Sequence, residues 1–410
     1  MSVSLIGFIG RGPYKPDGTR NPYYKARYRF RDWISPEVTF FLHAVLDWLR
    51  EHRGRGADRV IVLGTAGSMW DELVLALCSE RRDEVEDLYL TLVEEVDAQS
   101  TTLEHLSAVE NELSRTLRTE VHAELVPAGA TVEEQADVLA ALQRHVREDD
   151  RVYLDVTHGY RHQPMLALGA AVLLTRLRNA HIEDIFYGAN EMRPARDAPA
   201  PVVSLNWLLD LLSWAESVHQ LRLGGQLRAL NRVVRDSELQ KALADTSFLL
   251  SINQVHQAGQ AARHCLDTLA KAARDPILDL TRDAIENVLK DVAGCQRDAM
   301  GILAVARSAH RGQDYVRASI LLCEAVKKHE QHSGKLFDQD LFSEINGLRN
   351  ALAHAAGTSN DEVRGALSSH TAIKGMLQRQ LDLVTETVLS ADKSRQAHRK
   401  SAVSPDRDGT

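Results

Sequence analysis

Residues 349–354 read Arg-Asn-Ala-Leu-Ala-His and combine a permanent cation, a polar amide and an imidazole in one short stretch. A histidine can move a proton near neutral pH, and an arginine can hold a phosphate and offset charge in a transition state. These groups suit cleavage of RNA by its own 2′-hydroxyl, a reaction that requires no metal. Arg349, Asn350 and His354 are therefore the candidate catalytic residues.

The spacing of this motif limits how one copy can work. At about 100° per residue, Arg349 and His354 lie roughly 140° apart around a helix, so they do not share one stripe. A two-fold dimer that sets two such helices face to face would build a composite cleft. A second Arg-x4-His pair, Arg176 and His181, falls where a helix runs into a strand, and we expect it to be structural. A buried histidine beside a surface arginine remains the structural alternative at 349–354.

Three loops could bind a ligand, because each follows an expected buried strand. Residues 10–12 follow the expected strand 3–9, and residues 64–68 follow the expected strand 59–63. Residues 155–159 begin at the end of the expected strand 151–156. Parallel strands end at one rim of a sheet, so these loops should converge there. Backbone N–H groups at helix N-termini suit phosphates. The side chains that add donors for a sugar or base are Thr65, Ser68, Thr157 and His158.

Strand and helix patterns alternate through residues 1–205, which predicts an α/β Rossmann-like domain with a mainly parallel sheet. Residues 25–31 alternate basic and apolar side chains at period two, so we favour a half-buried strand there over a nucleic-acid platform. Ser35 is expected to cap a helix that runs through Leu49. Ser68 and Asp71 are expected to form the cap of a later helix.

The strand signal ends near residue 206, and residues 206–391 are predicted to form an all-α helical bundle. Residues 392–410 lack apolar periodicity and are expected to be a disordered tail. The segments with helical periodicity are 207–221, 248–272, 283–305, 315–329, 340–355 and 361–389.

Composition excludes several classes of protein. A net charge of −8 argues against stable binding to duplex DNA or to an anionic membrane. The four cysteines lie far apart, so neither a disulfide framework nor a zinc site is expected. No apolar run approaches the length of a membrane helix and no basic leader is evident, so we expect a cytoplasmic protein.

Several motifs resemble those of one known family. Residues 152–159, Val-Tyr-Leu-Asp-Val-Thr-His-Gly, contain the "DxTHG" signature of CRISPR-associated CARF-HEPN proteins. Residues 63–70 look like the second ligand loop of that family, and residues 349–354 are similar to its HEPN nuclease motif. The resemblance covers nearly the whole chain apart from the tail.

This resemblance implies a homodimer or higher homo-oligomer, activated by a cyclic oligoadenylate, that cuts single-stranded RNA without a cofactor. On family grounds we favour the tetra-adenylate ring. Arg11 stands where a small hydroxyl residue is expected in the first loop, which leaves the ring size open. The ligand residues carried over are Gly10, Arg11, Gly12, Thr65, Ala66, Gly67, Ser68, Met69, Trp70, Asp155, Thr157, His158, Gly159 and Arg161.

Two alternatives come from other functional classes. The helical half could serve only for dimerisation, which would make the chain a sensor or regulator. The sensor half could instead degrade its own ligand as a ring nuclease, with Thr157, His158 and Arg161 as the groups involved. A conventional dinucleotide enzyme fits poorly, because the loops lack a GxGxxG pattern.

Overall fold

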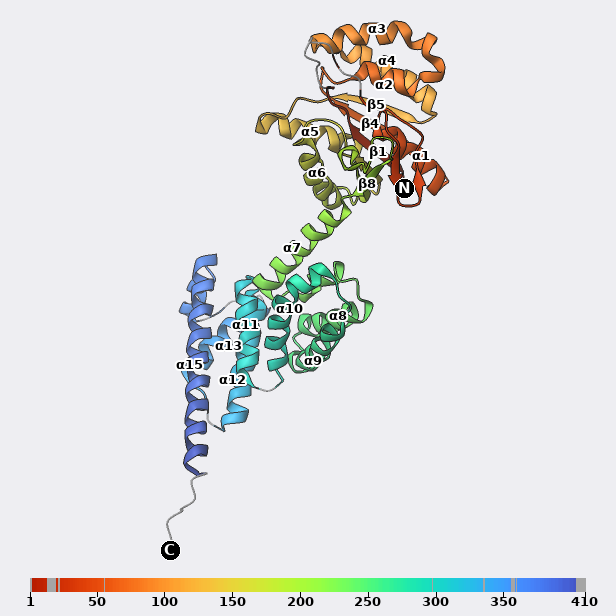
Figure 1. Ribbon diagram of the computed structural model, residues 1–410. Coiled ribbons are helices and arrows are strands. Elements are labelled where there is room, and N and C mark those ends of the chain that lie inside the picture. Colours follow the sequence, from red (N-terminus) through yellow and green to blue (C-terminus); the bar gives the residue numbers. More distant parts are fainter. Residues whose placement is uncertain are drawn as a thin grey trace. The chain divides into compact units, whose positions relative to one another are not determined.

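The computed structural model describes residues 2–12, 20, 23–54, 56–296, 298–334, 336–354, 358 and 360–402. The chain divides into two compact units, Met1–Leu209 and Asp210–Thr410 (Figure 1). The division falls within helix α7 (Asn206–Gly224), whereas the sequence predicted a boundary after residue 205.

The described residues of the first unit form an eight-stranded sheet with the order β3-β2-β8-β7-β6-β1-β4-β5. Five strands, β7-β6-β1-β4-β5, run parallel to one another, and the two antiparallel pairs are β7 with β8 and β2 with β3. This confirms the predicted α/β class with a mainly parallel sheet. The strands are β1 (Val3–Phe8), β2 (Tyr28–Phe30), β3 (Trp33–Ile34), β4 (Arg59–Gly64), β5 (Glu120–Leu125), β6 (Arg151–Asp155), β7 (His181–Gly188) and β8 (Ala200–Ser204).

Helices cover both faces of this sheet (Figure 1). One apolar core joins the sheet to α1 (Phe41–Arg53), α2 (Trp70–Leu77), α3 (Arg82–Ala98) and α4 (Leu103–Leu117). A second core joins its other face to α5 (Val132–His145) and α6 (Gln163–Leu177). All six residues of β1 and of β4 are buried, which explains why these strands read as continuous apolar runs in the sequence.

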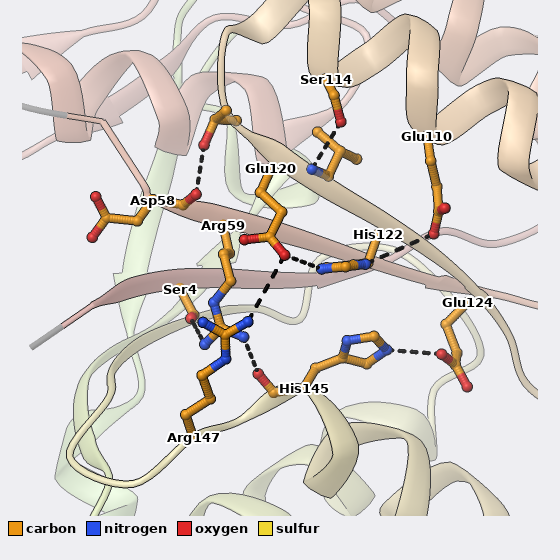
Figure 2. A network of polar contacts seen from close by, with 12 residues as sticks. Ser4, Asp58, Arg59, Glu110, Ser114, Glu120, His122, Glu124, His145 and Arg147 are labelled. Atoms are coloured by element: carbon orange, nitrogen blue, oxygen red, sulfur yellow. Dashed lines mark hydrogen bonds and ion pairs between the residues drawn. The ribbon is translucent and has the colours of Figure 1, made fainter.

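Polar side chains close the edge of the sheet at β5, as Figure 2 shows. The outward N–H groups of Val121 and Ala123 donate to Ser114 Oγ (3.0 Å) and Glu110 Oε1 (2.8 Å), both on α4. Nearby, the buried Arg59 binds Ser4 Oγ of β1 (2.8 Å) and forms an ion pair with Asp150. Helix side chains thus occupy two donors that a ninth strand would need.

The second unit contains only helices among its described residues, with one apolar core between them. The helices after α7 are α8 (Ser237–Ser251), α9 (Val255–Lys271), α10 (Pro276–Gly294), α11 (Ala299–Arg311), α12 (Tyr315–Ser333), α13 (Gln339–His354), α14 (Asp361–Ala366) and α15 (His370–Ala402). Two long predicted helices are each split in two. Asn253 turns the chain with a φ of 57° between α8 and α9, and Asp298 caps α11 by accepting from Gly301 N (3.0 Å).

Three further predictions about local structure were wrong. Ser35 does not cap a helix, because its Oγ accepts from Tyr28 N (2.9 Å), and α1 begins only at Phe41. The predicted helix 361–389 ends at Ala366, and Ser369 starts α15 by accepting from Ala372 N (3.2 Å). The helix α15 then runs to Ala402, past the expected start of a disordered tail at 392, because this stretch is free of glycine and proline. Residues 403–410 lie outside the described residues.

None of the described helices combines the length and the apolar character that a membrane crossing requires.

Candidate functional site

The three predicted ligand loops meet at the carboxyl edge of the sheet. Ile9 N donates to Leu63 O (2.8 Å), and Met69 N donates to Gly10 O (3.0 Å), so the first two loops are joined through their backbones. Gly10 also lies against Gly159, since a Cβ built on Gly10 would be 2.9 Å from the backbone nitrogen and Cα of Gly159. The convergence expected from parallel strands is confirmed.

The first loop is held by side chains from two directions. Gly10 N donates to the Tyr23 hydroxyl (3.0 Å), and Gly12 N donates to the Met69 sulfur (3.0 Å). Gly12 is buried, whereas Arg11 is partly exposed. Arg11 is therefore the side chain of this loop that can meet an anionic ligand. Tyr23 was missed as part of the site, because nothing in its spacing relates it to Gly10.

The second loop is shaped by residues that point inward. Ser68 Oγ accepts from Thr65 N (2.8 Å) and donates to Ile9 O (3.0 Å), and Trp70 Nε1 donates to Thr65 O (2.9 Å). Ser68, Met69 and Trp70 are at most 1% exposed, so they build the loop instead of facing solvent. Thr65 and Ala66 remain partly exposed, while Gly67 is buried.

The predicted cap of the following helix was wrong. Met69 is the N-cap of α2, and its side chain does not cap the helix. Asp71 is 1% exposed and pairs with Arg20 (2.6 Å), which also pairs with Asp97 of α3 (2.6 Å). Asp71 thus anchors Arg20 instead of capping the helix.

The third loop begins with a buried carboxyl group. Asp155 is 1% exposed, and its Oδ1 accepts from Thr157 N (2.8 Å). Burial raises the pKa of Asp155 to about 7, although hydrogen bonds from Thr157 oppose the rise. The Thr157 hydroxyl accepts from Gly188 N (2.9 Å). Asp155 therefore fixes the turn of the loop itself, and Thr157 fixes the loop to the end of β7.

His158 completes the beginning of α1. Its Nε2 accepts from Phe41 N (3.3 Å), the first residue of a helix whose N-cap, Phe40, supplies no side-chain cap. The ring packs against Tyr23, with centroids 4.7 Å apart, and against Phe40. Burial lowers the pKa of His158 to about 4, so the imidazole is neutral near pH 7.

Beyond His158, the loop opens to solvent. Gly159 adopts a φ of 97°, in the left-handed region that favours glycine, and Gly159, Tyr160 and Arg161 are exposed. The rim therefore presents two cationic side chains, Arg11 and Arg161, beside the N-terminus of α6. Two such guanidinium groups can hold phosphate groups.

The candidate catalytic residues lie on α13 in the second unit. Arg349 is half-buried, and its guanidinium donates to Asn346 Oδ1 (2.7 Å). It also adjoins Cys323 of α12, because the guanidinium opposes the rise that burial causes in the pKa of that thiol. Asn350 and His354 are exposed, and His354 is the last residue of the helix. Arg349 therefore faces α12, whereas the other two side chains face solvent.

Residues 4–191 match a protein family described as "CRISPR system endoribonuclease Csx1, CARF domain". The chain is also 23% identical over 277 residues to the CRISPR-associated protein MJ1674 of Methanocaldococcus jannaschii. That match covers 63% of this chain but only 42% of the relative. The family match spans most of the first unit and includes all three rim loops. The first unit is therefore similar to the CARF domain of this family, and the chain resembles CARF-containing CRISPR-associated proteins.

Proposed function

We propose that this chain is an endoribonuclease of type III CRISPR antiviral defence, activated by a cyclic oligoadenylate. The observation that carries the proposal is the meeting of three loops at one rim of a domain that matches the Csx1 CARF family. The helical unit is proposed to be a HEPN domain that cleaves single-stranded RNA. Its support is the Arg-x4-His motif on α13.

The activator would bind at the rim through its phosphates. Arg11 and Arg161 supply the cations that would meet these phosphates. Thr65 and Ala66 are the accessible residues of the second loop. The inward-facing residues, such as Asp155 and Trp70, would act by holding the loops in place. The tetra-adenylate ring is preferred on family grounds.

RNA cleavage would proceed by in-line attack of the 2′-oxygen on the adjacent phosphorus. His354 transfers the proton and Arg349 holds the phosphate, with the exposed Asn350 as a further hydrogen-bond donor to it. The bond to the 5′-oxygen breaks, leaving a 2′,3′-cyclic phosphate and a 5′-hydroxyl. No step of this reaction requires a metal ion.

Activation would require a homodimer, because Arg349 and His354 of one copy face different directions on α13. Two copies of the helix across a two-fold axis would bring these groups into one cleft. The ligand would lie across the same axis at the CARF rim. The ligand must bind the active state more favourably than the inactive state by about 5.5 kcal/mol to convert an almost fully inactive population into an almost fully active one.

The test is cleavage of a fluorescence-quenched single-stranded RNA in the presence of EDTA, with cyclic tri-, tetra- and hexa-adenylate added separately. Cleavage that appears with one ring and is lost in Arg349→Ala/His354→Ala supports the proposal. Arg176→Ala/His181→Ala removes the same residue types at the same spacing in the first unit and should cleave normally. Ring binding without RNA cleavage would show that the chain is a sensor or regulator instead. Degradation of the added cyclic oligoadenylate would reveal ring-nuclease activity.

A further inference from the structure

An aromatic pair lies at the rim: Tyr160 stands between the predicted ligand residues Gly159 and Arg161, and His162 follows them. The side chain of Tyr160 is 45% exposed. Its ring stacks on that of His162, with centroids 5.8 Å apart and an interplanar angle of 19°. Only three of the sixteen described Phe, Tyr and Trp residues of this unit are exposed, and Tyr160 is the one of these three that lies at the rim.

The backbone and the neighbouring loop hold this pair in place. Tyr160 N donates to Oε1 of Gln163, whose side chain is buried. His162 Nε2 donates to Ala128 O (2.8 Å), in the loop that follows β5. Gly129, with a φ of 83°, leaves room for the imidazole, since a Cβ there would be 2.9 Å from His162 Nε2. The Tyr160 ring is therefore supported from beneath before any ligand arrives.

A cationic side chain follows the ring directly. Arg161 is exposed, and the N-terminus of α6 begins two residues later at Gln163. An aromatic face beside a cation matches the two parts of a nucleotide. The base can stack on the ring while its phosphate meets the guanidinium.

We propose that Tyr160 is a stacking platform for one adenine base of the bound oligoadenylate, with His162 as its support. This rests on the proposed function and adds a base-recognition site to a rim whose other accessible groups suit phosphates and sugars. Arg161 fixes the phosphate next to that base. The fourth loop, 127–130, takes part by anchoring His162.

The direct test measures stacking with a cyclic tetra-adenylate in which one adenine is replaced by 2-aminopurine, whose fluorescence falls when it stacks on an aromatic ring. We expect quenching with wild type and Tyr160→Phe, and little with Tyr160→Ala. The affinity for unlabelled cyclic tetra-adenylate should fall by about tenfold or more in Tyr160→Ala, because base–aromatic stacking is worth 1–3 kcal/mol per base. His162→Ala should show an intermediate loss.

The control is Tyr24→Ala, which removes an exposed tyrosine (69% exposed) and should bind as wild type does. If wild type binds the ring and Tyr160→Ala binds equally well, the platform is wrong while the proposed function stands. If wild type binds no ring, both are wrong. If wild type is a dimer and Tyr160→Ala is a monomer, the aromatic ring of Tyr160 contacts a second copy of the chain, and the proposed platform is again wrong.

Discussion

The guanidinium of Arg349 donates to Oδ1 of Asn346, one turn earlier on α13, at 2.7 Å. This bond holds the half-buried cation toward Cys323 of α12. Asn346 therefore fixes the direction of the group that is proposed to hold the RNA phosphate.

Replacing Asn346 by alanine should lower ligand-activated RNA cleavage by about tenfold, because a hydrogen bond to a charged group contributes roughly 1.5–3 kcal/mol. Asn346→Asp keeps an acceptor for the guanidinium and should retain more activity. Single-turnover cleavage at saturating RNA measures the effect, with thermal unfolding as the check on folding. Equal activity in the alanine and aspartate variants would contradict a positioning role.

Asp155 should make the first unit less stable as the pH rises. Its folded pKa of about 7 lies above the model value of 3.8, so the folded chain binds more protons between these values. The contribution to stability is full below about pH 4 and is lost as the pH approaches 7. Relative to wild type, Asp155→Asn should gain at most about 1.4 kcal/mol per pH unit in this window. Urea unfolding at several pH values in this window measures the difference in free energy of unfolding between the variant and wild type. A difference that does not change with pH would show that the pKa of Asp155 is not raised in the folded chain.

His158 should have the opposite effect. Its folded pKa of about 4 lies below the model value of 6.5, so the unfolded chain binds more protons between them. Stability is therefore full above about pH 6.5 and is lost as the pH falls toward 4. His158→Gln cannot ionise and should unfold with less acid sensitivity than wild type. The same urea series measures how the free energy of unfolding changes with pH in His158→Gln and in wild type. Equal acid sensitivity of the two proteins would show that the pKa of His158 is not lowered in the folded chain.

Two glycine-to-alanine substitutions should change the free energy of unfolding in opposite directions. A methyl group on Gly10 would meet the backbone of Gly159, so Gly10→Ala should destabilise the unit by roughly 1–3 kcal/mol and weaken ligand binding. Gly169, inside α6, has open space around it, so Gly169→Ala should be stabilising by roughly 0.5–1 kcal/mol. Thermal unfolding of both variants is the measurement. A neutral Gly10→Ala would mean that the loops do not touch.

The sequence predicted the rim because strand ends are set by short-range patterns. Apolar runs followed by glycine marked β1 and β4, and parallel pairing then brought their loops together. Which loop residues face inward depends on contacts between distant segments. Ser68 and Trp70 were therefore named as ligand residues although they are buried, whereas Tyr160, inside the third loop, and His162, just after it, were not singled out. The individual site residues stay predictions.

Helix boundaries were predicted less well than helix positions. The helices α3 and α4 were missed, and so was α8 apart from its last four residues. The predicted helix 248–272 ran across the break between α8 and α9, because Asn253 gives no strong stop signal in the sequence. Arg349 and His354 lie on different sides of α13, as their spacing predicted. Whether they act together depends on a second copy, which periodicity in one chain cannot reveal.

The polar cover over β5 protects this edge of the sheet from pairing with a strand of another copy. Unpaired sheet edges seed fibrils, and here one edge is occupied by Ser114 and Glu110 while the other ends in β3, only two residues long. Copies can therefore accumulate at high concentration without templating one another's strands. Under the proposed function, this edge protection would let inactive copies persist in the cell until an infection supplies the activator.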